Sequence, residues 1–446
     1  MTDPGQGTVR PFPLQRIIII TTVFALVVAA LWQVIGALDD TGVNRSQPDP
    51  PASPGATEAA PTVDATPTEP IATPDLVPEW PVGSLPEMLN LAPNRLADGS
   101  LPLDDIATYA DIARWMAARG IATPASITDP AFAAWSAELA VLAIPDTLRA
   151  SGLDPAWDAA YGFSLLDVQQ VLQVGQAPDY VVIMRGAFDP AALQDAWVTS
   201  GYQPVELEGV TAWSLTPGDT IDLSPAASRP AMGSLNNIVL LEDGTLVGTA
   251  RTSRLGDTIR AIQGSDQSLA DDDAIATLLT PGTGIENIAS AVLLQGTMLQ
   301  GTSDDVPESL STPDTATPVA TPGAGDAMPP VQVVLVGLPL PGEAGVATPV
   351  SSDSVPLTIM LSMDDLDAAL QGRDWIEMRY PGLVSPITKA PYTDRFGQIT
   401  VRVIGPEPDD NPAAIVIGAS LERGRADWLA IVTDRDLGFA GWLPEE

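Results

Sequence analysis

The chain has 446 residues, and its 57 Asp and Glu residues against 20 Lys and Arg residues give a formal net charge of −37. So acidic a chain argues against nucleic acid as a partner, because nucleic-acid binding needs basic patches. It contains no Cys and no His, which excludes disulfides, thiolate nucleophiles, Ser-His-Asp triads and His-bound zinc. Without disulfides, the fold must be held together by packing alone.

The first predicted element is a transmembrane helix over residues 17–38. This apolar run contains no charged residue, and at about 1.5 Å per residue it spans about 33 Å, enough to cross a bilayer. Arg10 and Arg16 precede it, which predicts a cytoplasmic tail over 1–16 and an extracytoplasmic remainder. The alternative is a cleavable signal peptide, but its apolar core would be about 7–15 residues long. We therefore expect an uncleaved single-pass anchor in the cell membrane.

Residues 39–80 are predicted to form a disordered stalk. Prolines recur there among Ala, Thr, Ser and acidic residues, with almost no large apolar side chain to bury. The prolines favour an extended, semi-rigid spacer. The Ala-Thr-Pro units at 65–67 and 72–74 are suited to O-glycosylation if the host performs it.

Residues 81–175 are predicted to be the helical N-terminal part of the exterior region. Its apolar residues recur at spacings of three and four, as on one face of a helix. The expected helices are one capped by Asp104 or Asp105, carrying Ile106, Tyr109, Ile112 and Met116 and ended by Gly120; one after Asp129-Pro130 with Phe132, Trp135 and Leu139; and one from the Ser164-Leu-Leu-Asp167 capping box to Gly175.

Residues 176–301 are predicted to form a first α+β unit, because short strand-like runs replace the helical period. Its expected elements are a strand over 180–184, a helix from Asp189-Pro190 to Gly201, hairpins around Glu208-Gly209 and Asp243-Gly244, a helix with Leu255, Ile259 and Ile262, a cap at Ser268 with Asp271, and a strand over 288–298.

A low-complexity linker or insertion over 302–330 is predicted to precede a second α+β unit over 331–446. The fold class is therefore α+β, with antiparallel sheets and helices packed on one face. Both units follow the order strand, helix, strand, strand, helix, which is most of a split βαβ unit. Duplication of one unit and chance recurrence of this order are both open.

The second unit's expected elements are strands over 331–338 and 357–361, a helix capped by Ser362 and Asp365 running toward Trp375, strands over 399–404 and 413–420, and a helix around Trp428.

Turn and cap residues within 178–300 carry a resemblance to a family. They are Arg185-Gly-Ala-Phe-Asp-Pro-Ala-Ala-Leu-Gln194, Gly201-Tyr202, Glu208-Gly-Val210 and Leu241-Glu-Asp-Gly244. About a third of the chain thereby resembles uncharacterised bacterial envelope proteins with an N-terminal anchor, a low-complexity stalk and an α+β exterior domain. The resemblance implies an envelope location and supplies no activity and no functional residue.

The sequence offers little that predicts catalysis. It has no Gly-x-Ser-x-Gly and no Gly-Lys, and the interval from Ser385 to Lys389 is one residue longer than a Ser-x-x-Lys arrangement requires. Three acidic clusters could hydrolyse a glycoside or bind Ca²⁺, but we interpret them as a cap, a linker and a hairpin tip in contact with solvent. These clusters are Asp271-Asp-Asp273, Asp304-Asp305, and Glu407 with Asp409 and Asp410.

The ten Trp residues could form a carbohydrate platform. Several, however, occupy apolar positions of predicted helices, where a core role is expected. These are Trp115, Trp135, Trp197 and Trp428, whereas Trp32 lies at the predicted membrane boundary. We assign no catalytic, cofactor-binding or metal-binding residue and expect no cofactor.

The predicted function is that of a non-catalytic binding or structural module of the bacterial envelope. Its expected partners are the membrane, through 17–38, and an envelope protein or glycan of unknown identity, with no nucleic acid. The alternative is a carboxylate-dependent hydrolase of cell-wall or extracellular glycans. A cleft with two acids about 5–10 Å apart would favour that enzyme.

Overall fold

The computed structural model describes residues 80–95, 106–175, 180–216, 218–296, 328–341, 354–385, 387–405, 412–421, 427–434 and 436–438. The predicted tail, membrane helix and nearly all of the stalk lie outside these residues, as does the predicted linker as far as residue 327. The described residues belong to one compact unit, Asp75–Glu446. Among the helices of this described part, none is both long enough and apolar enough to span a bilayer.

The strands form one 12-stranded sheet in the order β11-β12-β10-β9-β8-β1-β2-β3-β7-β6-β5-β4. All neighbouring strands pair antiparallel. The strands are β1 Ile106–Asp111, β2 Val168–Val174, β3 Val181–Gly186, β4 Gln203–Leu207, β5 Val210–Ser214, β6 Asn237–Leu240, β7 Leu246–Thr249, β8 Ile288–Gln295, β9 Val331–Pro339, β10 Val355–Met363, β11 Thr400–Ile404 and β12 Ala413–Leu421.

The helices occupy the connections between these strands. The α-helices are α2 Leu85–Leu89, α3 Ile112–Ala118, α4 Phe132–Leu139, α5 Asp146–Ser151, α6 Pro155–Tyr161, α7 Pro190–Ser200, α8 Thr252–Ile262, α9 Asp273–Leu278, α10 Leu366–Arg379, α11 Tyr392–Phe396 and α12 Asp427–Thr433. The 3₁₀ turns are η2 Leu165–Asp167, η3 Ala226–Ser228, η4 Leu269–Asp271, η5 Ile285–Asn287 and η8 Tyr380–Gly382.

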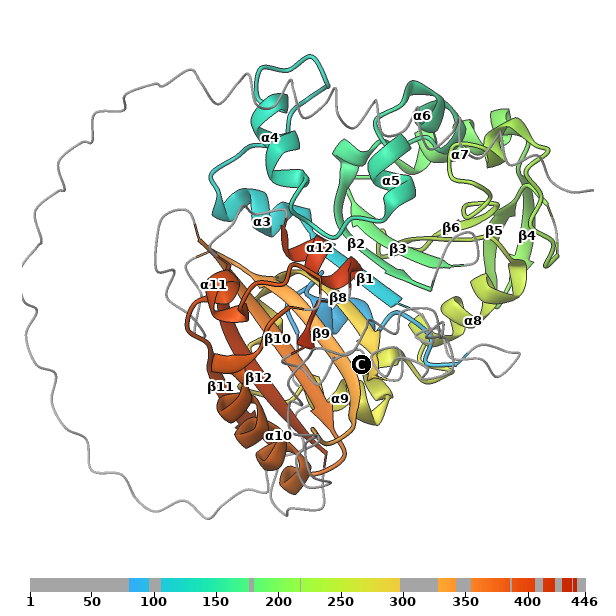
Figure 1. The fold of residues 1–446 in the computed structure, drawn as a ribbon. Coiled ribbons are helices and arrows are strands. Elements are labelled where there is room, and N and C mark those ends of the chain that lie inside the picture. The colour runs from blue at the N-terminus through green and yellow to red at the C-terminus, as the bar shows by residue number, and fades with distance from the viewer. Residues whose placement is uncertain are drawn as a thin grey trace, which may run out of the picture. The chain divides into compact units, whose positions relative to one another are not determined.

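The strand order repeats on both sides of the central β1–β8 pair (Figure 1). Outward from β1 come β2, β3, β7 and β6, and outward from β8 come β9, β10, β12 and β11. The chain order matches as well, because α7 follows β3 and α10 follows β10 before each outer strand pair. The β1 side differs in one respect: the hairpin β4–β5 is added beyond β6.

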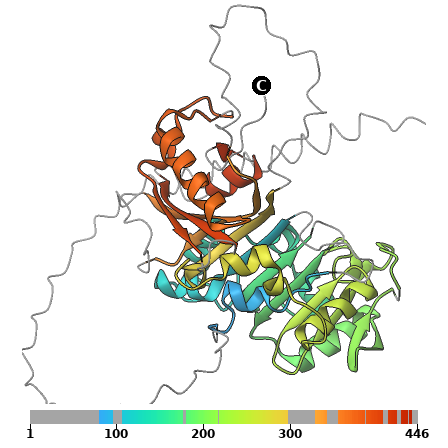
Figure 2. The same cartoon turned by 90° about the horizontal axis from the view of Figure 1, so that it is seen from below.

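Helices cover both faces of the sheet. Successive residues of β3 alternate between two core clusters, with Val182 and Met184 in the larger one and Val181 and Ile183 in the smaller one. The larger cluster includes buried residues of α7 and α10, and the smaller one includes those of α2, α8 and α9. Figure 2 shows the orange α10 and the yellow α9 on opposite sides of the C-terminal strands. The sheet is therefore buried on two sides, which gives its inner strands nearly continuous apolar sequences.

The predicted caps and turns beyond residue 180 are largely confirmed. Asp189 accepts hydrogen bonds from the N–H groups of Ala191 and Ala192 at the start of α7, and Gly201 ends that helix at φ 92°. Glu208 and Gly209 form the predicted two-residue turn between β4 and β5. The α+β class is thus confirmed.

The predicted helix through Ile106 and Tyr109 is wrong. Residues Ile106–Asp111 form β1, and the helix α3 begins only at Ile112, with Asp111 accepting the N–H of Arg114 as its cap. Because β1 is central and buried on both faces, its apolar residues need not alternate. Their chance spacing of three and four therefore imitated a helix.

The predicted helix from Ser164 to Gly175 is also wrong. The capping box of Ser164 and Asp167 exists, but it begins only the 3₁₀ turn η2. The chain then enters β2, which ends before Gly175 at φ 94°. Residues 81–175, predicted to be helical, thus contribute two central strands. The predicted separate sheets with helices on one face are likewise one sheet with helices on both.

Candidate functional site

The described acidic cluster caps helices. Asp271 accepts the N–H of Ser268 at 2.8 Å in the capping box of η4. Asp272 accepts the N–H groups of Ala274 and Ile275 at the start of α9. The clusters at 304–305 and 407–410 lie outside the described residues. Within the described ranges, no group of three or more acids is arranged to hold a metal ion.

The predicted core Trp residues are confirmed as core. Trp115, Trp135, Trp197 and Trp428 are each at most 2% exposed. Trp197 Nε1 donates to Tyr161 O at 3.1 Å, which satisfies the polar atom of the ring. None of the four can therefore serve as an exposed platform for a sugar.

Three polar side chains cross the middle of the sheet on the face of the smaller core cluster. Asp111 of β1 lies opposite Gln170 of β2, which lies opposite Arg185 of β3. Gln170 Nε2 donates to Asp111 Oδ1 at 3.2 Å, and Asp111 is fully buried. This polar row was not predicted from the sequence, because its three residues come together only once β1, β2 and β3 are paired in register.

Helix α2 and the turn before it cover the polar row. Glu87 of α2 lies 2.6 Å from Arg185 Nη2 and accepts the N–H of Gly83 at 3.0 Å. Tyr109 OH donates to Gly83 O at 2.7 Å. Gly83 has φ 76°, and a Cβ there would lie 2.6 Å from the side chain of Gln170. Only glycine allows this close approach, so the row is sealed by backbone rather than open to a ligand.

Burial dominates the electrostatics of the row. It raises the pKa of the Asp111 carboxyl, against the hydrogen bonds from Arg114 N and Gln170. It also raises the pKa of Glu87, against the opposing charge of Arg185. The row thus joins α2 to three strands at the cost of desolvating two acids.

A second buried cluster surrounds Asp436. Its carboxylate accepts hydrogen bonds from Ser385 Oγ and Tyr392 OH, each at 2.7 Å, and pairs with Arg395 Nη1 at 2.6 Å. Burial raises the pKa of the Tyr392 hydroxyl. Ser385 also accepts the N–H of Thr388 at 2.9 Å, so its hydroxyl is fully used in holding a turn.

A small recess lies beneath α5 and α6. It is lined mainly by apolar residues, with the hydroxyls of Thr147 and Tyr180 bonded to each other at 2.5 Å. The indole of Trp157 also lines it. No carboxylate lines the recess, so it lacks the acids that glycoside hydrolysis requires.

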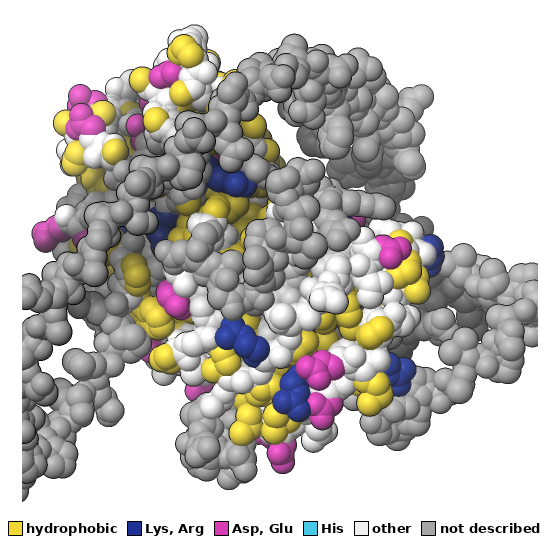
Figure 3. Space-filling view, turned by 90° about the vertical axis from the view of Figure 1, so that its left-hand side faces the viewer, with side chains coloured by type: hydrophobic (Ala, Val, Ile, Leu, Met, Phe, Trp, Pro, Cys, Tyr) yellow, Lys and Arg dark blue, Asp and Glu magenta, His cyan; other side chains and the backbone are white. Residues whose placement is uncertain are grey.

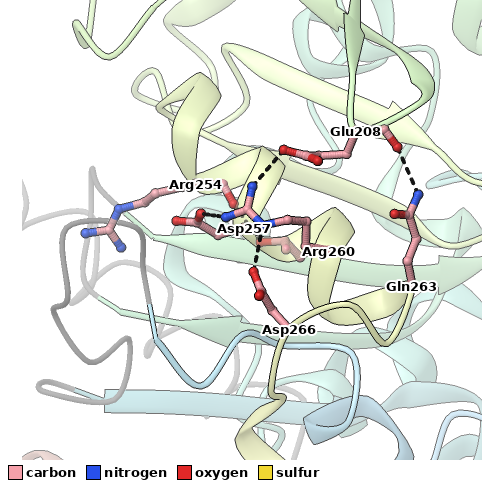
Figure 4. A network of polar contacts seen from close by, with 7 residues as sticks. Glu208, Arg254, Asp257, Arg260, Gln263 and Asp266 are labelled. Carbon is pink, nitrogen blue, oxygen red and sulfur yellow. Dashed lines mark hydrogen bonds and ion pairs between the residues drawn. The ribbon is translucent and has the colours of Figure 1, made fainter.

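An ionic network fixes the β4–β5 hairpin to α8 (Figure 4). Arg260 of α8 contacts Glu208 at the hairpin turn, Asp266 and the buried Asp257, at 2.5–2.7 Å. Gln263 Nε2 donates to Glu208 O at 3.1 Å. These contacts raise the pKa of Arg260, Asp266 most of all, so its charge is permanent. The network keeps the hairpin against the body of the sheet.

The two outermost strands of the sheet are β4 and β11, which lie at its opposite ends (Figure 1). β4 contains Pro204 and the exposed Glu206, two features that discourage pairing with another strand. β11 has the sequence Thr-Val-Arg-Val-Ile, without proline and with one charge.

Neither family models, curated proteins nor solved structures gave a match when they were compared with this chain.

Proposed function

We propose that the protein is a membrane-anchored, extracytoplasmic module of the bacterial envelope that binds or supports a partner without catalysis. The observation that carries this proposal is the use of its described carboxylates. Asp271 and Asp272 of the acidic cluster cap helices, and the buried Asp111 and Asp436 join strands, helices and turns. The apolar run over 17–38, after Arg10 and Arg16, supports the anchor and its orientation.

The remaining parts of the proposal concern the chain's organisation. Residues 39–80 serve as a disordered stalk and 302–330 as a linker or insertion, because both lack apolar residues to bury. The two halves that repeat the strand order, β1 to β7 and β8 to β12, are copies of one ancestral unit, so each copy begins before the predicted boundaries at 176 and 331. Their shared strand order and their shared chain order support this duplication.

Protease treatment of intact spheroplasts tests the location. With one epitope at each end of the chain, protease should remove the C-terminal epitope and leave the N-terminal one protected. Protection of both epitopes would refute the orientation.

Purified cell-wall sacculi test the absence of catalysis. The full chain in detergent should release no reducing sugar ends from them. Release that is lost in a folded variant with an altered carboxylate would establish the hydrolase instead.

A further inference from the structure

The end of the sheet at β11 corresponds to an edge that is occupied in the other half of the molecule. β6 and β11 hold the same place in the repeated strand order, fourth outward from the central strands β1 and β8. β6 pairs with β5 along its outer edge, with Trp213 opposite Ile238. Among the described strands, β11 pairs only with β12. The molecule itself therefore illustrates what this edge can receive, which is an antiparallel strand.

The direction of the β11 backbone groups follows from the pairing across the sheet. In an antiparallel ladder bonded and non-bonded pairs alternate, so each residue directs its N–H and C=O to one neighbour only. Gly175 N donates to Ile106 O at 2.9 Å, which fixes the phase of the β1–β2 ladder. The same alternation can be followed from strand to strand, because residues that lie directly opposite one another form a single row across the sheet. This row is Leu172, Tyr109, Ala291, Gly337, Thr358, Gly418 and Thr400.

This alternation assigns Thr400, Arg402 and Ile404 to the ladder with β12. Val401 and Val403 consequently direct their backbone groups outward. The same rule gives outward groups on β4 to Glu206 and Pro204, and proline has no N–H to offer. One edge of the sheet is therefore blocked, whereas no described strand occupies the other.

Helix α10 forms a wall beside the open edge. Val401 and Val403 pack on the larger core cluster, as do Trp375 and other residues of α10. Contacts flank the strand at both ends: Leu366 of α10 lies 3.5 Å from the Cβ position of Gly405, just after β11, and Tyr380 OH, just after α10, donates to Gly397 O, before β11, at 2.8 Å. Figure 3 looks onto this side of the molecule and shows apolar side chains interspersed with basic and acidic ones.

The pairing of β5 with β6 indicates which kind of side chain a strand bound to β11 would direct toward α10. On β5, Trp213 points to the larger core cluster, and its ring centroid lies 5.9 Å from that of Trp197 on α7. Trp375 occupies the corresponding helix α10 but is only partly buried, whereas Trp197 is 1% exposed. An incoming aromatic side chain would bury Trp375 further, as Trp213 buries Trp197.

We infer that the β11 edge binds an extended segment of another envelope polypeptide, which adds an antiparallel strand with an aromatic or large aliphatic side chain toward α10. Arg402, exposed on the opposite face, favours an acidic residue at the adjacent position of that segment. A second copy of this chain is the poorer occupant, because copies with a formal net charge of −37 repel one another. The inference rests on the proposed binding function and specifies its partner.

A peptide copy of β5 is the probe that tests the inference. Fluorescein-labelled Gly-Val-Thr-Ala-Trp-Ser-Leu, the sequence of 209–215, is titrated with the full chain in detergent, and its anisotropy is measured. We expect saturable binding. Val403→Pro removes an outward N–H and should weaken binding at least about tenfold, whereas Val403→Ala keeps that N–H and should stay within about twofold.

Changes in the peptide test the same contact without altering the protein. N-methylation at the residues copying Thr211 and Trp213 removes the N–H groups that would face β11 and should abolish binding. N-methylation at those copying Ala212 and Ser214 should preserve it. Absence of saturable binding, or equal binding of both methylated peptides, overturns the inference.

Sedimentation of the full chain, which measures its oligomeric state, tests whether a second copy of the chain occupies the β11 edge instead. If the native chain forms a dimer and Val403→Pro forms only a monomer, the strand that binds β11 comes from a second copy of this chain, and the inference of another polypeptide is wrong. The protease and sacculus experiments do not depend on β11, so failure of the peptide to bind leaves the proposed location and non-catalytic role standing.

Discussion

The two ends of the sheet differ although the halves that carry them share one strand order. At one end, the β4–β5 hairpin covers β6, and the network around Arg260 fixes the hairpin to α8. At the other end, no such hairpin covers β11 within the part of the chain that the structure describes, and the chain passes directly from α10 and α11 into it. Covering a sheet edge therefore takes more than an added strand. The cover here also has a proline and an acidic residue on its outermost strand, β4, and an ionic contact that fixes it to α8.

The largest difference between the two ends should appear in their Trp residues. Trp197→Ala removes a fully buried ring and should lower the free energy of unfolding by about 3–5 kcal/mol. Trp375→Ala removes a partly buried ring and should cost only about 1–2 kcal/mol. Denaturant unfolding of both variants measures the two values. Equal losses would contradict the view that the ring of Trp375 is less deeply buried than that of Trp197.

Removing Arg260 should loosen the covered end. Arg260→Ala removes the ion pair with the buried Asp257 and the contacts with Glu208 and Asp266, and we expect a loss of about 1–3 kcal/mol. Hydrogen exchange should accelerate at the amides of β4 and β5 and stay unchanged in β11. Arg402→Ala is the matched control at the other end and should change stability by less than about 0.5 kcal/mol. Unchanged exchange in the hairpin would show that its pairing alone secures it.

The buried carboxyl of the polar row, on strands β1 to β3 of the covered half, should make the stability of the chain depend on pH. Burial raises the pKa of Asp111 in the folded chain above its ordinary value of 3.8. Between these two pKa values the folded state binds more protons than the unfolded state, so stability falls as pH rises through this window. Asp111→Asn should therefore lose this part of the pH dependence.

Thermal unfolding from neutral pH down toward 3.8 measures the effect. As the pH is lowered, the native chain should gain stability relative to Asp111→Asn. Asp367→Asn, which alters an exposed acid of α10, is the control and should run parallel to the native chain. Parallel behaviour of Asp111→Asn as well would rule out a burial effect on this carboxyl.

The smallest effects should come from two residues with positive φ. Lys389 has φ 59° and Glu208 has φ 49°. Asn tolerates this conformation better than either, so Lys389→Asn should stabilise the chain by about 0.5–1 kcal/mol. Glu208→Asn gains the same relief but loses the contact with Arg260, and its net effect should be near zero or unfavourable. A clear gain from both substitutions would mean that the Arg260 contact contributes little.

The sequence predicted local features well and pairing poorly. Caps and turns such as Asp189, Gly201 and Glu208-Gly209 depend on neighbouring residues, and their positions were correct. The strand at Ile106 was missed because a strand buried on two faces has no alternation to detect. Asp111, Gln170 and Arg185 come together only through strand register, which no local pattern encodes. The open edge likewise depends on the order of all the strands.

The position of α2 has a mechanical consequence. Tension from a membrane anchor would enter the domain at Trp80 and meet α2 before it meets β1. The contact of Glu87 with Arg185 and the bond from Leu269 N to Ala92 O, at 2.8 Å, would pass that tension to β3 and to the segment before α9. A pull on the proposed stalk would thus be distributed over distant parts of the sheet, and β1 would carry none of it until α2 detaches.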